Sequence, residues 1–553
     1  MTTTSQPTSA SGALDSRSAD VAAFAAGGLA AALGIAVSEF IAGLLAGAPS
    51  LVIAIGDFII ENQPPGGKEI FVDLFGEADK LVLNGMIVTG AIIIAGVLGV
   101  GGRRDWNIRV VGFVTAGLAG RIGALLRPWT DQLLAIFTVA ASTLAAIGAI
   151  RVMLMATNPA WGATEPKVAG EAKAAAVAAD DAAAVSESPD PAAEMPDWDR
   201  RRFLQIGGRV AVGSVILGVV GRNLLQNRPG GPAIDVELPV AAGPVPSVPP
   251  TASLDVPGIT PIVVPNDQFY KIDTALVSPR VNVDTWRLTI KGMVDREVTL
   301  TYDELSEMPL FEQYVTIACV SNEVGGRLVG NALWTGADLR EVLDMAGVRP
   351  DATQIASRSV DGWNCGFPTE WAMKPDRKPM IALGMNGSPL PLDHGFPARL
   401  IIPGLYGYVS ATKWLSEIEL TTREDFDGYW IPRGWAKDAP ILTQSRIDVP
   451  RRGSVVEAGP IAIAGVAWAP DRGVIGVEVR VDEGEWQTAE ISEPLNDATW
   501  VQWMLAWEGE PGGHRVEVRS IDGTGTVQTE ERTRPAPDGA RGHHLIDFTV
   551  VQA

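Results

Sequence analysis

Cys319 is the residue whose type and position in this chain most clearly suggest chemistry. It follows an apolar, β-branched run at 314–318 and precedes a polar, glycine-rich turn at 321–326. A thiolate at a strand end is a soft metal ligand, and glycine lets a bulky group approach the backbone closely. The pattern predicts either a metal whose other ligands come from a cofactor or a catalytic nucleophile.

A second cysteine leaves a simpler interpretation open. The chain contains only two cysteines, Cys319 and Cys365, so four-cysteine zinc or iron–sulfur frameworks are excluded. A buried free thiol or a Cys319–Cys365 disulfide explains the local pattern as well as a ligand does. Cys365 lies in the run 361–367 and is interpreted as an apolar cysteine near a pocket, with a disulfide or a pocket role as alternatives.

Composition bounds the classes of protein to consider. A chain of 553 residues has room for three or four domains, and its net charge of −21 argues against binding nucleic acid. The mean hydropathy of +0.15 is high for a soluble protein, and residues 1–225 account for it. The sequence therefore predicts a membrane region followed by a larger soluble part.

Five stretches are long and apolar enough to cross a bilayer, which takes about 20 residues. The run 51–60 is too short, and with Asp57 and Glu61 it is interpreted as interfacial or re-entrant. Together with Glu39, these carboxylates are candidates for an intramembrane function, although a simple anchor is the preferred interpretation. The five predicted spans are 21–46, 81–101, 108–126, 132–155 and 203–221.

Positive charge predicts the orientation of these spans. Arg103, Arg104 and Arg109 separate the second and third spans, and three arginines at 200–202 precede the fifth. Since basic loops stay in the cytoplasm, the N-terminus is predicted inside and everything after about residue 225 outside. The run 199–205 also resembles a twin-arginine export signal, with ordinary positive-inside charge as the alternative.

The pattern along the chain predicts a multidomain protein. From 263 strands and helices mix, which favours an α+β domain; strands are predicted at 286–290 and 298–300 and a helix at 335–343. After 441 only strands are predicted, at 461–468, 474–481, 499–507 and 514–520, as in an immunoglobulin-like β-sandwich. The predicted segments are a disordered terminus (1–18), a four-span region (19–155), a disordered cytoplasmic linker (156–199), a fifth span (200–225), a proline-rich tether (226–262), an α+β domain (263–440) and a sandwich (441–553).

A second motif, at 394–404 and continuing to 413–415, is far more specific than a lone cysteine. Together with the Cys319 run, it resembles the sulfite oxidase family of molybdopterin enzymes over residues 263–553. The resemblance implies a molybdopterin-binding domain at 263–440 and an immunoglobulin-like domain at 441–553. The latter often dimerises in the family, so a homodimer is one expectation.

The resemblance also implies a cofactor and the residues that hold it. A mononuclear molybdenum bound to molybdopterin is expected to take Cys319 as its protein ligand. The residues expected to contact the pterin are Asn266, Asn322, His394, Arg399 and Lys413. No haem is expected, because none of the four histidines lies in the first 225 residues and a membrane haem usually needs two.

Departures from the family bear on the substrate. Glu323 and Val324 stand where sulfite oxidases carry arginines, and 272–274 replaces an Arg-Asn-His run. A sulfite dianion gains most from several fixed cations, so their loss puts sulfite in doubt. The residues predicted to line the substrate pocket are Tyr429, Arg433 and Trp435.

These inferences predict a multi-pass membrane protein with an extracytoplasmic molybdopterin domain that transfers oxygen atoms to or from a small-molecule substrate. Sulfoxide reduction is modestly favoured over sulfite oxidation, and electrons must come from or go to an external donor or acceptor. Two alternatives of another class remain: an exterior binding module without cofactor, and a membrane transporter or sensor that relies on the carboxylates of the bundle.

Overall fold

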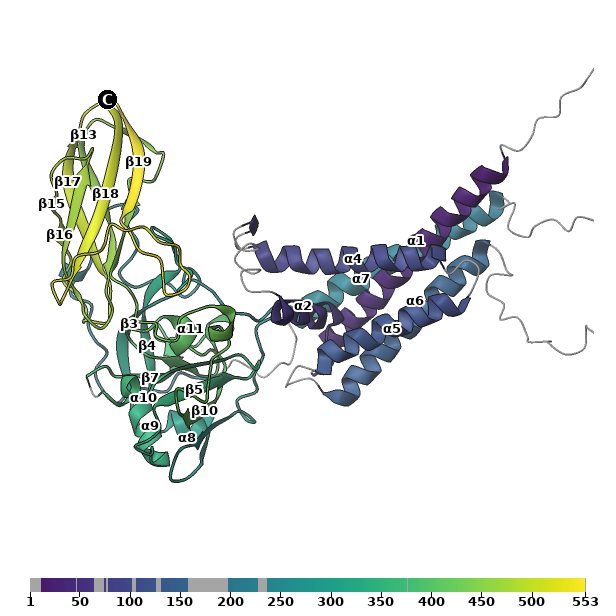
Figure 1. The fold of residues 1–553 in the computed structure, drawn as a ribbon, viewed down its shortest axis with the longest axis horizontal. Helices are drawn as coiled ribbons and strands as arrows, with labels where there is room; N and C mark the ends of the chain where they lie inside the picture. Colours follow the sequence, from purple (N-terminus) through teal and green to yellow (C-terminus); the bar gives the residue numbers. More distant parts are fainter. Residues whose placement is uncertain are drawn as a thin grey trace, which may run out of the picture. The chain divides into compact units, whose positions relative to one another are not determined.

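The computed structural model describes residues 11–45, 47–63, 74–75, 78–101, 106–125, 131–157, 197–226, 236–374 and 376–552. It divides into two compact units, Met1–Pro229 and Gly230–Ala553 (Figure 1), and each is described by itself. Several predictions fall wholly or partly outside the described residues: the terminus 1–10, the loop arginines Arg103 and Arg104, and most of the linker 156–199.

The first unit is helical, as predicted. Four of its helices contain stretches long and apolar enough to cross a membrane: Ala19–Leu44, Asp79–Gly101, Gln132–Met155 and Arg201–Leu225. These stretches coincide with four of the five predicted spans. The helices are α1 (Ser11–Leu44), α2 (Leu51–Asn62), α4 (Asp79–Gly101), α5 (Trp106–Leu125), α6 (Gln132–Thr157) and α7 (Asp197–Gln226).

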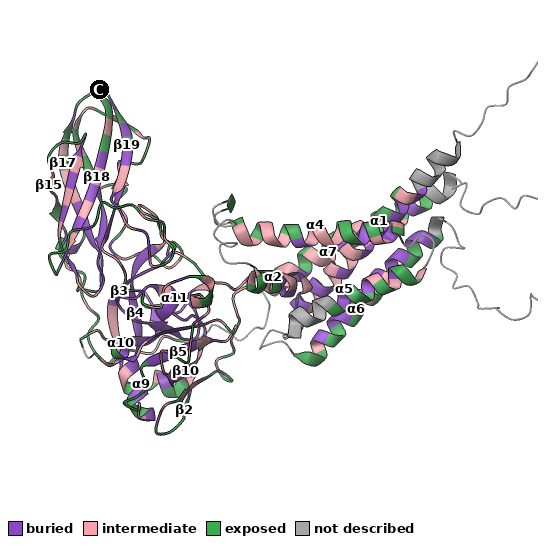
Figure 2. Ribbon diagram, in the orientation of Figure 1, coloured by how far each residue is buried: buried purple, intermediate pink, exposed green. Residues whose placement is uncertain are grey.

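Helix α5 occupies the remaining predicted span but is not among these four candidates. Arg109 and Arg121 interrupt its apolar sequence. One of its faces nevertheless exposes the apolar side chains Ile108, Val111, Val114 and Leu118, as Figure 2 shows in green along the helices of this unit. An exposed apolar face of this length suits lipid better than water.

Helices α1 and α7 cross closely through glycine. A Cβ added at Gly43 would lie 2.5 Å from the carbonyl oxygen of Gly221. Next to this crossing Glu39 is 6% exposed and pairs with Arg222 at 3.4 Å, and it also accepts a hydrogen bond from Ser50, the N-cap of α2. Glu39 is therefore bound into the packing of the bundle, as a buried carboxylate must be.

The first domain of the second unit contains one mixed and one antiparallel sheet, which share a core around Trp334, Trp414 and Phe396. The first sheet has the strand order β2 (Val298–Thr301), β1 (Arg287–Gly292), β10 (Leu415–Thr421), β5 (Gln354–Ser359) and β6 (Asn364–Pro368). The second has the order β3 (Leu310–Ala318), β4 (Val329–Asp338), β7 (Met380–Met385) and β8 (Ser388–Pro389), with β9 (Arg399–Ile401) paired to β7.

Short helices connect these strands. They are α8 (Tyr302–Ser306), α9 (Leu339–Ala346), α10 (Thr369–Met373) and α11 (Gly407–Ser410). The helix predicted at 335–343 is wrong in its first half, because Thr335 is buried in strand β4 and pairs with Gly384. Helix α9 begins only after Asp338, whose side chain caps it by accepting a hydrogen bond from Arg340 N at 2.8 Å.

The second domain is a sandwich of two sheets, and all four strands predicted for it are confirmed. One sheet has the order β11 (Gln444–Val449), β13 (Gly459–Trp468), β17 (Val501–Gly509) and β16 (Glu490–Ile491). The other has β12 (Val455–Glu457), β19 (His544–Val551), β18 (Gly512–Asp522), β14 (Val474–Val481) and β15 (Gln487–Thr488). Alternate residues of β14 and β18 are buried and form the shared core with Ile463, Trp503 and Phe548.

An extended segment at 242–264, here called the strap, crosses both domains. Ala242 N donates to Leu310 O on β3, and Glu493 N of the sandwich donates to Thr251 O. Gln502 on β17 accepts from Leu254 N at 2.7 Å and donates to Thr260 O at 2.7 Å. Much of the segment predicted as a tether is thus hydrogen-bonded to the second unit.

Candidate functional site

Cys319 directly follows strand β3 and begins a turn at 319–326, here called the Cys319 turn. Its side chain is buried, with 8% exposed, and its N–H donates to Leu328 O at 2.9 Å. Asn322 closes the turn, since its N–H donates to Cys319 O and its Oδ1 accepts from Leu328 N at 2.8 Å. Asn322, which is predicted to contact the pterin, therefore stabilises the backbone turn that presents the sulfur of Cys319.

His394 ends the 3₁₀ turn η4 (Leu392–His394) and is fully buried. Its Nε2 lies 2.8 Å from the carbonyl oxygen of Asn266, and its Nδ1 has no hydrogen-bond partner among the described residues. Burial, helped by the charge of Arg399, lowers the pKa of His394 to about 4, so the ring is neutral at ordinary pH. Because Nε2 must donate to the carbonyl, Nδ1 is left as a buried acceptor.

Arg399 begins strand β9 and lies beside His394. Its Nη1 donates to His394 O at 3.2 Å, its guanidinium carbon lies 5.3 Å from the ring centre of Trp334, and it is 5% exposed. Its Nε has no hydrogen-bond partner among the described residues. Burial lowers the pKa of Arg399 to about 10, which still leaves it charged at neutral pH. Arg399 thus has a buried N–H donor, at Nε, that can bond to a ligand.

Tyr270 links the two motifs. Burial is the main cause that raises its pKa; the charge of Cys319 raises it further and that of Arg399 lowers it. One side chain therefore interacts electrostatically with residues from both sequence motifs, which places them in one neighbourhood. Tyr270 lies outside both sequence motifs, and the only local signal for it is the aromatic pair Phe269 and Tyr270 shortly after Asn266.

Lys413 is 7% exposed and pairs with Asp273 at 2.9 Å, while it also donates to Asp393 O at 2.8 Å. Asp273 lies in the run 272–274 that departs from the family pattern. A second carboxyl, Asp361, faces the same group: burial raises its pKa, Asp273 raises it further, and Lys413 lowers it. Lys413 is thus a cation balanced by carboxylates as well as a candidate cofactor contact.

The side chain of Asn266 is committed to its own surroundings. Its Nδ2 donates to Met385 O at 3.1 Å and its Oδ1 accepts from Asn386 at 2.7 Å. Its carbonyl oxygen is the partner of His394. Asn266 therefore orients His394 through the backbone, and its side chain is occupied by bonds to the protein.

The predicted pocket residues Tyr429, Arg433 and Trp435 lie around the short turn η5 (Ile431–Arg433). Arg433 stacks on the Tyr429 ring at 3.7 Å and donates to its carbonyl oxygen at 2.6 Å. Trp435 is 7% exposed and packs at 5.8 Å from Tyr408. Trp435 belongs to the core of the domain, whereas Tyr429 and Arg433 are only half-buried.

Cys365 on β6 forms no disulfide with Cys319. Its sulfur lies 3.3 Å from Ser357 Oγ and 3.2 Å from Thr412 Oγ1, and it is 1% exposed. Burial raises the pKa of Cys365 to about 11, so it stays a thiol at neutral pH. The disulfide alternative is wrong for this structure, and the interpretation as a free buried cysteine is confirmed, although its sulfur contacts two hydroxyl groups.

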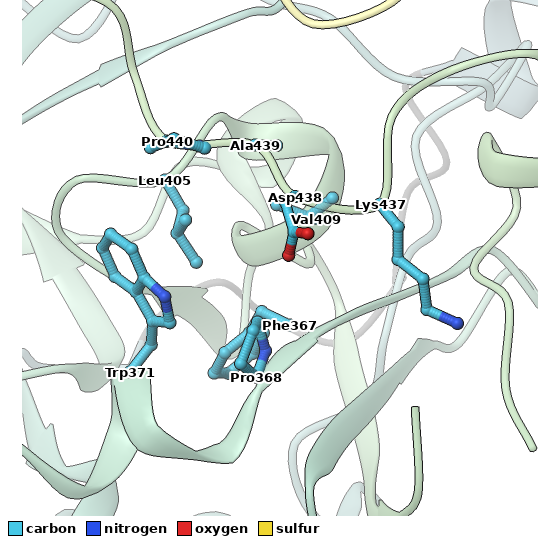
Figure 3. A pocket seen from close by; sticks show the side chains of 9 residues that line it. All are labelled: Phe367, Pro368, Trp371, Leu405, Val409, Lys437, Asp438, Ala439 and Pro440. Carbon is cyan, nitrogen blue, oxygen red and sulfur yellow. The ribbon is translucent and has the colours of Figure 1, made fainter. Parts of the chain in front are cut away.

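A cavity of about 180 Å³ lies between β6, α10 and α11 (Figure 3). Trp371, Phe367 and Leu405 line it with apolar surface, and at its edge the amino group of Lys437 bonds to Phe426 O and Asp427. None of the sequence-predicted site residues lines this cavity. Its lining offers packing surface for an apolar group, without a set of convergent polar atoms.

The residues around Cys319 fit a molybdopterin cofactor. Among the described residues no group of three or more His, Cys, Asp or Glu side chains is placed to hold a metal ion. A molybdopterin brings metal ligands of its own, the two sulfurs of its dithiolene. The buried acceptor His394 Nδ1 and donor Arg399 Nε offer hydrogen bonds that such a polar ring and its phosphate require.

Comparison with known proteins agrees with this chemistry. Residues 275–430 match the family model of the oxidoreductase molybdopterin binding domain. Human mitochondrial sulfite oxidase is 30% identical over 316 residues, which cover 48% of this chain and 57% of that protein. The sulfite oxidase of Arabidopsis thaliana is 24% identical over 55% of this chain and 90% of its own length.

One solved structure, the sulfane dehydrogenase SoxCD from Paracoccus pantotrophus, is 21% identical, with a TM-score of 0.46. The match covers 57% of this chain and 89% of that one. The chain spans about half the length of the mammalian sulfite oxidases that it matches.

Proposed function

Because this chain carries a molybdopterin-binding domain of the sulfite oxidase family, we propose that it transfers an oxygen atom to or from a small sulfur compound outside a membrane. The observation that carries the proposal is the joint electrostatic neighbourhood of Cys319, Tyr270 and Arg399, built from two motifs that both fall within the matched domain or next to it. A molybdenum–molybdopterin cofactor at this site supplies the two-electron redox chemistry when bound.

The residues of the chain have distinct roles in this proposal. Cys319 presents the thiolate that binds the metal, and the Cys319 turn holds its backbone. Arg399 directs a charged donor at the cofactor, and neutral His394 offers an acceptor. Tyr270 is half-buried and interacts electrostatically with both Cys319 and Arg399.

Sulfoxide reduction is the reaction we favour. Glu323 is exposed and Val324 half-buried in the Cys319 turn, so the turn adds no positive charge for an anion. A neutral sulfoxide needs hydrogen-bond donors and an apolar wall rather than several cations. Tyr429 supplies an aromatic wall, and Arg433, stacked on its ring, supplies hydrogen-bond donors with a single positive charge.

Sulfite oxidation is the alternative, and Arg541 favours it. The pKa of Tyr406 is raised first by burial and then by the charge of Cys319, while Arg541 lowers it. An arginine from the C-terminal domain therefore acts on the same neighbourhood as the cysteine. Arg541 also pairs with Asp538. Because this carboxylate partly neutralises its charge, Arg541 binds an anion less strongly than an arginine without such a partner would. The similarity to the human and Arabidopsis thaliana sulfite oxidases also supports this reaction.

The deciding experiment measures molybdenum and pterin in the purified full-length chain, for wild type, Cys319→Ser and Cys365→Ser. We expect about one molybdenum per chain in wild type and Cys365→Ser, with the spectrum of the metal changed only in Cys319→Ser. Turnover is then compared for a methyl sulfoxide with a reduced dye and for sulfite with an oxidised acceptor. A folded chain that binds neither metal nor pterin would contradict the proposal and favour an exterior binding module.

The location of the enzyme is also a proposal. Four candidate spans and the exposed apolar face of α5 support a membrane anchor, with the second unit on the exterior side if α5 spans as well. The sandwich is proposed to be immunoglobulin-like and to mediate a homodimer. Electrons are proposed to pass to or from a separate redox partner.

A further inference from the structure

The Cys319 turn is held from the C-terminal sandwich as well as from its own domain. Arg446 on β11 is 5% exposed, and its Nη1 donates to Gly326 O at 2.9 Å. Its Nε donates to Asp448 at 2.7 Å and its Nη2 to Thr260 Oγ1 at 2.8 Å. All three nitrogens are engaged, so the planar guanidinium has one fixed orientation.

His544 packs against the same turn at Gly325, one residue before Gly326. Its Nδ1 accepts a hydrogen bond from Ile447 N at 2.9 Å, which leaves Nε2 to carry the proton. A Cβ added at Gly325 would lie 2.2 Å from His544 Cδ2 and 2.3 Å from Nε2, so the ring lies directly against the glycine. Gly325 also has φ +79°, a conformation that other residues rarely adopt.

The turn leaves little freedom on its own side. Gly326 N donates to Glu323 O at 2.8 Å, and a Cβ at Gly326 would lie 2.5 Å from Asn322 Oδ1. Asn322 in turn bonds to Cys319 O and to Leu328 N. A displacement of Gly325 or Gly326 therefore displaces Asn322, and with it the backbone of Cys319.

We propose that Arg446 and His544 are positioning residues that fix the direction of the Cys319 sulfur, so that the sandwich completes the cysteine site of the neighbouring domain. The role of the sulfur as a metal ligand rests on the function proposed above. The physical reason is that ligand geometry tolerates only small displacements, and residues behind the ligand usually determine it.

The first test uses the full-length chain in detergent, prepared without cofactor. Iodoacetamide modification of Cys319 is followed by peptide mass spectrometry in Arg446→Gln and His544→Ala. Cys365 serves as an internal control because it is buried and protonated. Freed motion of the turn is expected to raise the rate at Cys319 about ten-fold in both variants. An unchanged rate in folded variants would overturn the proposal.

Two variants of the same sandwich serve as matched controls. Arg515 on β18 pairs with Asp547, and His514 bonds to Asp482 and Glu510 O. Arg515→Gln and His514→Ala are expected to leave the modification rate of Cys319 within about two-fold of wild type. A comparable increase in the controls would mean that any weakening of the sandwich exposes the cysteine, and the specific role would be rejected.

The metal gives a second readout. In chain loaded with cofactor, Arg446→Gln is expected to shift the molybdenum paramagnetic resonance spectrum, while Arg515→Gln leaves it unchanged. If Cys319→Ser also leaves the spectrum unchanged, the ligand assignment fails. The modification rates of the cofactor-free chain then still decide whether the sandwich positions the cysteine.

A rescue experiment tests the contact at Gly325. Gly325→Ala is expected to lower the melting temperature, and adding His544→Ala should recover part of the loss because it removes the collision. Strictly additive losses would contradict the contact. If the variants fail to fold, hydrogen exchange in wild type decides: the amides of Asn322 and Gly326 should exchange as slowly as Ile447, and fast exchange would overturn the proposal.

Discussion

Arg399 is a cation in a buried position, and its surroundings determine what it can bind. It lies against the face of Trp334 and bonds to the carbonyl of His394, so its charge is only partly compensated by the protein. Desolvation makes such a charge costly, and an anionic or strongly polar ligand offsets that cost. His394 differs, because burial keeps it neutral and turns its Nδ1 into an acceptor.

Replacing Arg399 with lysine should therefore reduce cofactor retention although the charge is kept. Lysine cannot donate along the direction of Nε and bond to His394 O at the same time. We expect the pterin content of the purified chain to fall about ten-fold, which corresponds to the loss of one charged hydrogen bond. Arg358→Lys, at a half-buried arginine paired with Glu417 and Glu419, is the control and should retain the cofactor. Equal retention in both variants would exclude a direct contact by Arg399.

His394 should make the protein sensitive to acid. Its pKa in the folded chain is about 4, below the value of 6.5 for an exposed histidine, so the unfolded chain binds a proton that the folded chain does not. The contribution of His394 to stability is full above pH 6.5 and is lost as the pH falls toward 4. The loss amounts to about 3 kcal/mol.

Thermal unfolding between pH 4 and 8 measures this effect. His394→Asn should flatten the acid side of the stability profile, because asparagine takes up no proton. His514 is the contrast: its pKa is raised, by hydrogen bonds to Asp482 and Glu510 that outweigh desolvation, and its contribution is lost as the pH rises instead. An acid slope that stays the same in His394→Asn would show that another group causes it.

At the scale of elements, the strap joins the two domains of the second unit. Gln502 is fully buried on β17 and bonds to the backbone of the strap at both Leu254 and Thr260. The sandwich also contacts the Cys319 turn, through the hydrogen bond of Arg446 and the packing of His544. Segments far apart in the chain therefore form one interface between the two domains.

Gln502→Ala should loosen the strap. It leaves the N–H of Leu254 and the carbonyl of Thr260, both in half-buried residues, without their partner, which costs about 1 to 2 kcal/mol. Limited proteolysis is expected to cut within the strap at a higher rate, and the melting temperature should fall. Gln487→Ala, at an exposed position on β15, should change neither quantity. Protection of the strap in Gln502→Ala would show that its other contacts suffice.

At the scale of the whole molecule, helix α7 is both a candidate membrane span and part of the predicted export signal. Helix α7 begins at Asp197 and contains the basic run 200–202, within which the candidate span Arg201–Leu225 begins. Positive charge alone orients a span, whereas an export signal of the twin-arginine type depends on arginine itself. The two interpretations predict different responses to a substitution that conserves charge.

Replacing Arg201 and Arg202 with lysine keeps the charge and removes the arginine pair. We expect the second unit to stay inside the cell and to become resistant to protease added to intact spheroplasts, while the protein remains in the membrane fraction. Arg103→Lys with Arg104→Lys is the matched control and should leave the second unit accessible. Continued export of the first variant would favour ordinary positive-inside charge.

The sequence by itself determined the long apolar helices of the first unit, the four strands predicted in the sandwich and the motifs around Cys319 and His394. Those features follow from local hydropathy, residue alternation and chemically specific runs, which need no knowledge of distant neighbours. It could not determine the boundary between β4 and α9, because Thr335 joins a strand only through pairing with β7.

Only the tertiary structure decided which residues act together at the site. Lys413 meets Asp273 across 140 positions of sequence, Asn266 uses its carbonyl for His394, and Cys365 hydrogen-bonds to Ser357 and Thr412 instead of joining Cys319. Arg446 and His544 also contact the Cys319 turn from more than a hundred positions away in the sequence. Such contacts arise from the packing of whole sheets and domains, which no local pattern in the chain encodes.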